Sequence, residues 1–279
     1  MIYSSVITVP PSSPVRARIN SGAGFWPSAA AVAKRTVRKF FRTPQLIVLG
    51  TVQSALFLLI FRYVFGGAIN VDGLPYVDFL VPGFVTTAVL FSGMGAAAGV
   101  AEDLEQGFFD RLRSLPIPRA SVMAGRCLAD TALVTWGLAV ATALGFVVGF
   151  RMHGSVAAGL AAFGLCVLLG FAFEWVFITI GLVGGSAQAA QGISLLVSPL
   201  TFVSSAYVPV SSMPSWLQAF ADHQPITPMV NAVRCLTGGP QVEALLHHST
   251  AYYVGLSLIW TAAIVIVFGL VAVVRFSRR

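Results

Sequence analysis

Six long apolar runs dominate the pattern of hydrophobic and polar positions along the chain, and short polar stretches separate them. Each run has the roughly 20 apolar residues that an α-helix needs to cross the hydrocarbon layer of a membrane. Backbone groups find no water partners in that layer, so helices are expected, and the alternating segments of a β-barrel are absent from the sequence. We therefore predict an all-α integral membrane protein with six transmembrane helices, at Gln45–Phe65, Phe79–Ala101, Cys127–Phe150, Val156–Val183, Ala189–Val208 and Ala251–Val274.

The residues before the first run divide into a tail and an amphipathic segment. Residues 1–24 are rich in Ser, Pro and Gly and lack a repeating apolar face, which is typical of a disordered tail. Between Phe25 and Arg42, a helical period places apolar side chains on one half of a helix and basic side chains on the other. Such a helix is suited to lie among lipid headgroups, and a second role in contacting a cytoplasmic partner stays open. Its basic residues are Lys34, Arg35, Arg38, Lys39 and Arg42.

A polar island, Glu102–Arg119, lies between the second and third runs. Each of its charges would cost roughly 2.5–3.5 kcal/mol at the membrane centre, so the island belongs at one membrane face. A helical period places Leu104, Phe108, Leu112 and Leu115 on one face, and a proline, Pro116, then ends the pattern. We interpret the island as a short amphipathic helix that docks onto a cytoplasmic partner. The alternative is a solvated loop folded against its own bundle.

A second polar segment, Ser211–Ser249, separates the last two runs. Its pattern predicts two short helices, around Pro214–Ala221 and Thr227–Leu236, because prolines and glycines punctuate the segment between and after them. We expect these helices to cap the outer mouth of the bundle or to enter the outer leaflet.

The distribution of basic residues sets the expected orientation. The chain carries a net charge of +7 but is only 10% charged and 57% hydrophobic, which indicates a membrane protein rather than a nucleic-acid-binding one. With six spans both termini lie on one side, and all of the 17 basic residues except Arg62, Arg151 and Arg234 fall on that side. The positive-inside rule makes it the cytoplasmic face of the cell membrane. We expect a bacterial membrane, with anionic lipid as a partner of the basic residues. The expected domains are the tail (1–24), the interfacial helix (25–42), a six-helix transmembrane domain (43–274) and a basic C-terminus (275–279).

Few ionisable groups lie within or near the predicted spans. Glu174 lies deep in the fourth run, where a carboxyl group is a functional hypothesis by default. It could contact a cationic substrate along a transport path, relay protons, or hydrogen-bond a neighbouring helix. Asp130 follows Arg126 by four residues, a spacing that favours a local ion pair.

The sequence predicts no catalytic, metal or cofactor site on this chain. A phosphate-binding P-loop needs a lysine directly after a glycine, but Lys34 and Lys39, the two lysines of the chain, follow Ala33 and Arg38. The three cysteines form no CxxC pair, so neither a zinc site nor a disulfide framework is implied.

Two motif blocks resemble a known family. The acids after the second run are followed by Gly107, Arg111-Leu112, Pro116, Arg119, Arg126 and Asp130, and are preceded by VPGF at 81–84. Together with the outer segment at 214–240 (PSWLQAFADHQPITPMVNAVRCLTGGP), this resembles the permeases of ABC-2 type transporters, in their daunorubicin-resistance drug-efflux branch. The resemblance covers roughly residues 25–275. One departure is that the island begins Glu-Asp-Leu-Glu-Gln, where family members often carry a basic residue.

The resemblance implies a half-transporter that works with a second permease copy or a paralogue and with a dimer of separate ATPase subunits, which bind ATP and Mg. It implies that 25–42 is a connecting helix and that 102–115 is the coupling helix. The residues assigned to ATPase coupling are Glu102, Asp103, Leu104, Glu105, Gly107, Phe108, Arg111, Leu112, Leu115, Pro116 and Arg119.

The expected function is therefore ATP-driven export of hydrophobic or amphipathic compounds by a permease subunit that is not itself an enzyme. Export of lipid or polysaccharide by the same class of machine is the alternative within the class. A secondary transporter coupled to an ion gradient is the alternative from another class, but it would favour several intramembrane charges and an inverted repeat.

Overall fold

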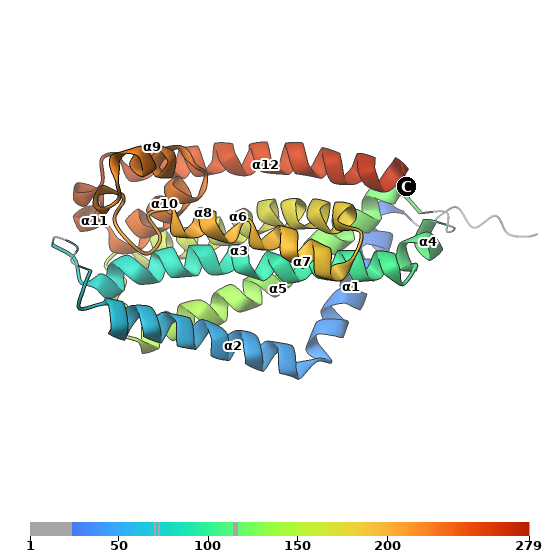
Figure 1. The fold of residues 1–279 in the computed structure, drawn as a ribbon, viewed down its shortest axis with the longest axis horizontal. Coiled ribbons are helices and arrows are strands. Elements are labelled where there is room, and N and C mark those ends of the chain that lie inside the picture. The colour runs from blue at the N-terminus through green and yellow to red at the C-terminus, as the bar shows by residue number, and fades with distance from the viewer. Residues whose placement is uncertain (1–23, 70, 72, 114–116, 279) are drawn as a thin grey trace, which may run out of the picture.

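The computed structural model describes residues 24–278, apart from residues 70, 72 and 114–116, and the regular elements in that part of the chain are all helices. Five of the helical segments are long and apolar enough to cross a membrane. They lie side by side in one elongated bundle (Figure 1), which is the fold of a multi-pass membrane protein. The five are α2 (Pro44–Leu59) continued by the π-helix η1 (Ile60–Phe65), α3 (Tyr76–Glu105), α5 (Arg119–Val147), α6 (Val156–Gly184) and α12 (Thr250–Arg278).

The remaining helices are shorter, and they include the two that were predicted in the outer polar segment. They are α1 (Phe25–Phe41), α4 (Phe108–Arg113), α7 (Ala187–Leu195), α8 (Ser198–Phe202), the 3-10 helix η2 (Val210–Ser212), α9 (Ser215–His223), α10 (Ile226–Gly238) and α11 (Pro240–Leu245).

The all-α class is confirmed, and five of the six predicted runs are long helices. The first begins at Pro44, where a residue without an N–H group loses no hydrogen bond. Its last turns widen into a π-helix, which the hydrophobic pattern does not indicate. The largest shift of a boundary is in α5, which begins at Arg119 rather than near Cys127.

The predicted fifth run, Ala189–Val208, differs from the others because it is not one helix. It consists of α7, a turn, α8, and then a stretch of turns over residues 203–208. Serine and threonine hydroxyls throughout this stretch donate to nearby carbonyls, as Ser198 does to Leu195 and Ser204 to Thr201, and such bonds compete with a helical ladder. The chain still runs from one end of the bundle to the other between α6 and α9 (Figure 1).

Close contacts between backbones hold the bundle together around α3. Most residues of α3 are buried, against α5, α6, α7 and α10. A Cβ atom at Gly93 would lie 2.1 Å from the Phe177 ring, and one at Gly181 would lie 2.5 Å from the carbonyl oxygen of Ala97. These glycines therefore allow α3 and α6 to approach more closely than larger residues would permit.

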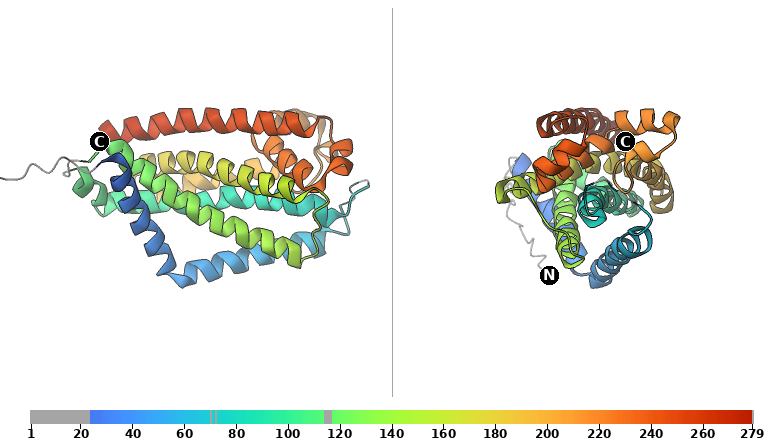
Figure 2. Two further views of the ribbon diagram at one scale, coloured as in Figure 1. Left: turned by 180° about the vertical axis from the view of Figure 1, so that it is seen from behind. Right: turned by 90° about the vertical axis from the view of Figure 1, so that its left-hand side faces the viewer.

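The two ends of the bundle differ in composition. Helix α1 crosses obliquely at the end that also holds α4 and the C-terminal end of α12 (Figures 1 and 2). We call this the charged end. Helices α9, α10 and α11 lie at the opposite end, together with the loop after η1, and we call this the outer end.

Helix α1 packs against α5 through small residues, which the predicted lipid-facing role did not anticipate. Its buried side chains are Ser28, Ala29, Val32 and Thr36. At the crossing, a Cβ atom on Gly125 would lie 2.4 Å from the carbonyl oxygen of Ala29. The position of α1 therefore depends on a glycine of α5.

We predict that Gly125→Ala destabilises the protein by about 1–3 kcal/mol, because the added methyl group overpacks the crossing of α1 and α5. Thermal unfolding of the purified protein in detergent measures the change. Gly95→Ala is the matched control, since a Cβ atom there meets nothing within 4 Å, and it should leave the unfolding temperature unchanged or slightly raised. Equal unfolding temperatures for the two variants would contradict the prediction.

Candidate functional site

The polar island at the charged end is a helix, a turn and a second helix. Glu102–Glu105 form the last turn of α3, and Gln106 follows as the cap. Gly107 then adopts a φ of 64°, which a residue without Cβ adopts at little cost, and α4 begins directly after it. The single helix that the pattern predicted over the island is therefore interrupted at Gly107.

One carboxylate, Asp103, joins three helices at this end. Arg35 of α1 donates to both of its oxygens, at 3.1 Å to Oδ1 and 3.5 Å to Oδ2. Arg126 of α5 donates from Nη1 to Oδ2 at 2.8 Å. Asp103 itself lies on α3 and is only 2% exposed. Because both arginines meet the same buried group, α1, α3 and α5 cannot move relative to one another without breaking a charge-assisted hydrogen bond.

Arg126 is almost as deeply buried as Asp103, and its remaining donors are also used. Its Nε donates to Asp130 Oδ2 at 2.6 Å, which confirms the predicted local ion pair. Its Nη2 lies 3.4 Å from the carbonyl oxygen of Ala96, and a Cβ atom on Gly99 would lie 2.6 Å from the same nitrogen. Gly99 therefore makes the space that this guanidinium occupies.

A second, more exposed set of contacts extends the network to α4. Lys39 of α1 donates to Glu102 at 3.0 Å, and Gln106 donates to the same carboxylate. The guanidinium of Arg35 also lies 3.7 Å from the centre of the Phe108 ring. This cation–π contact places α1 directly against the first residue of α4. An exposed ion pair such as Lys39–Glu102 contributes little by itself, so Arg35 is the stronger connection.

The apolar side of the island packs against its own bundle. Phe109 is buried and meets Phe276 of α12 edge to face, with ring centres 5.4 Å apart. Leu104, Phe108 and Leu112, the expected docking residues, are half-buried against the same cluster. Within 102–112, among the side chains that the structure describes, the exposed ones are Glu105, Gln106 and Arg111. Of the other predicted coupling residues, Arg119 begins α5, and Leu115 and Pro116 lie outside the described residues.

Glu174 lies close to this network but forms no part of its hydrogen bonds. It is 1% exposed on α6, and its Oε2 has no hydrogen-bond partner among the described residues. It is near enough to Arg126 and Asp130 to interact with both electrostatically. The sequence identified this carboxyl as unusual, but only the fold places it beside the ion network.

Sequence spacing does not indicate the most connected residues of the site. Asp103 was one of several acids in the island, and Arg126 was assigned only to a local pair. Their contact joins positions 23 residues apart, and Arg35 joins Asp103 across 68. Gly99 lies against the guanidinium of Arg126 in the fold, but nothing in their sequence positions indicates this contact.

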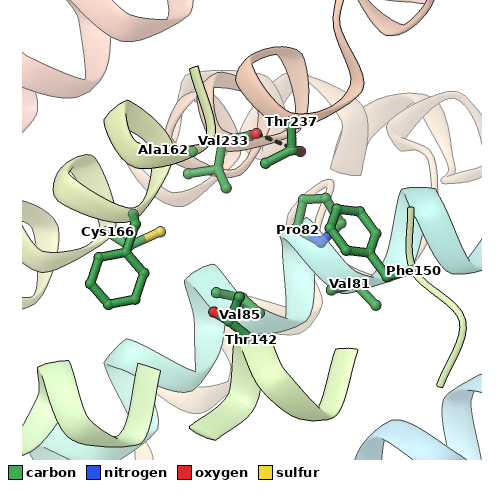
Figure 3. Close-up of a pocket in the computed structure, with 11 residues that line it drawn as sticks. Val81, Pro82, Val85, Thr142, Phe150, Ala162, Cys166, Val233 and Thr237 are labelled. Carbon is green, nitrogen blue, oxygen red and sulfur yellow. Dashed lines mark hydrogen bonds between the residues drawn. The ribbon is translucent and has the colours of Figure 1, made fainter. Parts of the chain in front are cut away.

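A small cavity lies between α3, α5, α6 and α10 (Figure 3). Apolar side chains such as Val81, Val85 and Val233 line it, together with Cys166 and the hydroxyl groups of Thr142 and Thr237. Its volume of about 60 Å³ is well below the roughly 300–1,000 Å³ of pockets that hold drug-sized ligands. This cavity cannot hold such a molecule in the conformation described.

The sequence profile of ABC-2 type transporters matches residues 28–236, which include the island and most of α1 and α10. The chain belongs to the ABC-2 type transporter family. The match covers every helix that contributes to the Asp103 network, so the site lies within the family's common region.

Two of three similar proteins carry names that refer to drug resistance. The chain is 29% identical over 272 residues to the daunorubicin resistance ABC transporter permease protein DrrB1 of Streptomyces coeruleorubidus, which covers 94% of this chain and 93% of the relative. It is 26% identical to the probable doxorubicin resistance ABC transporter permease protein DrrC of Mycobacterium tuberculosis, over 88% of this chain and 86% of the relative. A putative transport permease, ycf38, of Cyanophora paradoxa is 24% identical over 74% of this chain and 72% of the relative.

We predict that Arg126→Met destabilises the protein by about 3–5 kcal/mol, because it leaves Asp103 and Asp130 buried without their shared partner. The measurement is the unfolding temperature and the yield of monodisperse protein in detergent. Adding Asp103→Asn and Asp130→Asn to the same chain should recover part of the loss, since the unpaired charges are then removed. An Arg126→Met protein as stable as the wild type would show that the network does not hold the helices together.

Proposed function

We propose that this chain is the membrane subunit of an ATP-driven exporter for hydrophobic or amphipathic compounds of the drug type. The names of the daunorubicin and doxorubicin resistance relatives support the class of cargo. The observation that carries the mechanism is the Asp103 network, which links the island to α1 and α5. A subunit driven by another protein needs a rigid path from its contact surface to its spanning helices, and this network provides one.

The path would begin at α4. Displacement of α4 by a partner reaches α12 through the ring contact of Phe109 and Phe276, and reaches α1 through the contact of Phe108 and Arg35. The buried pairs of Asp103 then transmit the displacement to α3 and α5. Buried charge pairs suit this task because separating them is costly, whereas apolar contacts can slide.

ATP would be hydrolysed by a partner, an ABC ATPase dimer that binds ATP and Mg. The absence of a P-loop lysine from the sequence supports this division of labour. The exposed residues Glu105, Gln106 and Arg111, with the accessible edges of Phe108 and Leu112, form the surface offered to the ATPase. The surface that we propose for ATPase contact is therefore mixed polar and apolar, whereas the sequence predicted a single apolar face.

A second copy of the chain, or a paralogue, would complete the transport path. The small cavity supports this, because about 60 Å³ within one chain leaves no room for a drug-sized cargo. The burial of Glu174 favours a structural role for this carboxyl, and contact with a cationic cargo would require its helix to move.

Helix α1 would be the interfacial helix, with three faces of different chemistry. One face of small residues packs on α5. A second exposes Trp26 and Phe41, the latter next to the exposed Trp136 of α5, and is suited to enter lipid. The third carries basic residues that are exposed and form no ion pair in the described part of the chain, which suits anionic headgroups. These basic residues are Lys34, Arg38 and Arg42.

The topology would comprise six crossings with both termini in the cytoplasm. The broken passage through α7 and α8 would be the fifth crossing, since it runs the length of the bundle (Figure 1). The excess of basic residues at the charged end supports a cytoplasmic location for that end.

Inverted vesicles that contain the chain and its ABC ATPase should accumulate an anthracycline such as daunorubicin in an ATP-dependent manner, as fluorescence quenching would report. Vesicles with the chain alone should not, because no site on it hydrolyses ATP. Accumulation driven by an ion gradient without ATP would indicate a secondary transporter instead. ATP-dependent movement of fluorescent lipid, with none of the drug, would favour lipid export.

Arg35→Gln should lower ATP-dependent transport about fivefold or more, because it removes the charge-assisted hydrogen bonds that join α1 to Asp103, each worth about 1.5–3 kcal/mol. Lys34→Gln is the matched control. It removes one exposed charge from the neighbouring position, where the described residues provide no ion pair, and should stay within about twofold of the wild type. Both variants should insert into the membrane normally. Equal transport by the two would rule out the proposed role of Arg35.

A further inference from the structure

The broken fifth crossing ends in irregular backbone that is buried in the bundle. Residues 203–208 form turns, and Ser204, Ser205, Ala206 and Tyr207 are all buried. Peptide carbonyls that are buried away from water need hydrogen-bond partners within the protein. The partners of these carbonyls therefore show what holds the segment in place.

The partners are side chains from distant parts of the chain. Gln224 donates to the carbonyl oxygen of Val203 at 3.1 Å and lies 3.4 Å from that of Leu200. Arg234 donates to the carbonyl oxygen of Ser205 at 2.7 Å and lies 3.4 Å from that of Ala206. Residues at and near α10 thus fix one side of segment 203–208, and on the other side Tyr76 of α3 donates to the carbonyl oxygen of Tyr207 at 3.2 Å. We call Gln224, Asn231 and Arg234 the outer polar cluster.

Arg234 is the centre of this cluster and joins it to α3. The residue is 1% exposed. Its Nε and Nη2 both donate to the carbonyl oxygen of Phe79, and its guanidinium lies 3.7 Å from the centre of the Phe79 ring. Its Nη1 donates to Asn231 Oδ1, which also accepts a hydrogen bond from Ser205 Oγ. One side chain therefore ties together α3, α10 and the irregular segment.

The charge of Arg234 is balanced by carbonyl dipoles rather than by an acid. In the described part of the chain it forms no ion pair, and its hydrogen bonds go to peptide and amide oxygens. Burial lowers the pKa of Arg234 to about 9, so the guanidinium keeps its proton at neutral pH. Carbonyl partners can be exchanged for water at less cost than a buried carboxylate partner, so this cluster is suited to open and close again.

The cluster lies next to the small cavity. Val81 and Pro82 of α3 line the cavity, and so do Val233 and Thr237 of α10, so the same two helix segments border both (Figure 3). On α3, a Cβ atom at Gly83 would lie 2.0 Å from the carbonyl oxygen of Ala206, which shows how tightly the segment sits there. The cavity cannot widen between α3 and α10 while Arg234 holds both helices.

We propose that Arg234 and Asn231 are positioning residues that keep the outer end closed, and that segment 203–208 must separate from α10 for cargo to leave. The inference rests on the proposed function as an exporter. It assigns to the outer end a role separate from that of the Asp103 network at the charged end.

A reversible cross-link tests the inference on the intact complex of the chain with its ATPase. Ser205 Oγ and Asn231 Oδ1 lie 2.8 Å apart, so a Ser205→Cys/Asn231→Cys pair places two thiols across the contact. Mass spectrometry of the oxidised protein confirms the disulfide before transport is measured. Oxidation should lower ATP-dependent transport about tenfold or more, and a reductant should restore it, because the locked segment cannot leave α10. Ser155→Cys/Ala158→Cys, a pair within the first turn of α6, is the control and should transport equally in both states.

The outcomes separate this inference from the proposed function. Equal transport by the oxidised and reduced forms of the Ser205–Asn231 pair would overturn the inference and leave the exporter function standing. If neither the wild type nor the reduced pair transports any cargo, the exporter function fails. Thiol accessibility then tests by itself whether Arg234 holds segment 203–208 closed against α10.

Thiol accessibility needs no cargo. Cys235 is buried next to Arg234, and burial raises the pKa of its thiol, so a charged maleimide should label it slowly. With Cys127→Ala and Cys166→Ala in the background, Arg234→Met should speed labelling about tenfold or more in the ATP-free complex. Arg151→Met removes an exposed charge and should not. Unchanged labelling in Arg234→Met, in protein that elutes as the wild type does, would overturn the inference.

Discussion

The carboxylate of Asp103 is the constraint on which the charged end depends. It is buried on α3, and two arginines from α1 and α5 supply its hydrogen bonds. A charge in that position is tolerated only while both partners stay, so the three helices are fixed by the cost of exposing or unpairing it. The neighbouring features follow from this arrangement, including the glycine that makes room for Arg126 and the contact of Arg35 with Phe108.

The two ends of the bundle use buried arginines in different ways. Arg126 is surrounded by carboxylates, and separating it from them would leave unpaired charges in an apolar environment. Arg234 meets peptide carbonyls and an aromatic ring, which are weaker and more replaceable partners. A transporter that is driven by another protein requires a stiff connection where force enters and a releasable contact where cargo leaves. The two environments thus agree with the proposed direction of coupling.

Apolar packing also changes how the polar island is understood. Phe108 and Leu112 lie half-buried against the bundle, and Phe109, which the helical period did not single out, is fully buried against Phe276. The reason is Gly107, whose positive φ ends α3 and turns α4 onto the end of α12. The predicted apolar face exists, but the turn at Gly107 packs part of it against the bundle, so its residues are only partly exposed. What remains exposed is a mixed surface, and a polar rim is common where two proteins meet.

The sequence by itself determined that the chain lies in a membrane, that its fold is all-α, and roughly where the long helices are. In lipid, an apolar run such as Val156–Val183 has no stable backbone conformation other than a helix. Its own length and composition therefore determine that it forms a membrane-spanning helix. The family was also within reach, because the resemblance is carried by two blocks, and the residues of each block are close together along the chain. The same local logic indicated the pairing of Arg126 and Asp130, four residues apart on one helix.

Tertiary structure alone decided which charges meet and which backbone is left irregular. The contacts of Arg35 and Arg126 with Asp103, and of Arg234 with Ser205, join residues that no helical period relates. The irregular stretch that ends Ala189–Val208 has partly the same origin. Local hydroxyl groups compete with its helical ladder, and side chains from elsewhere in the chain satisfy the carbonyls that the stretch leaves free. Gln224, which follows α9, and Arg234 of α10 supply these hydrogen bonds, and both reach the segment only once the bundle has formed.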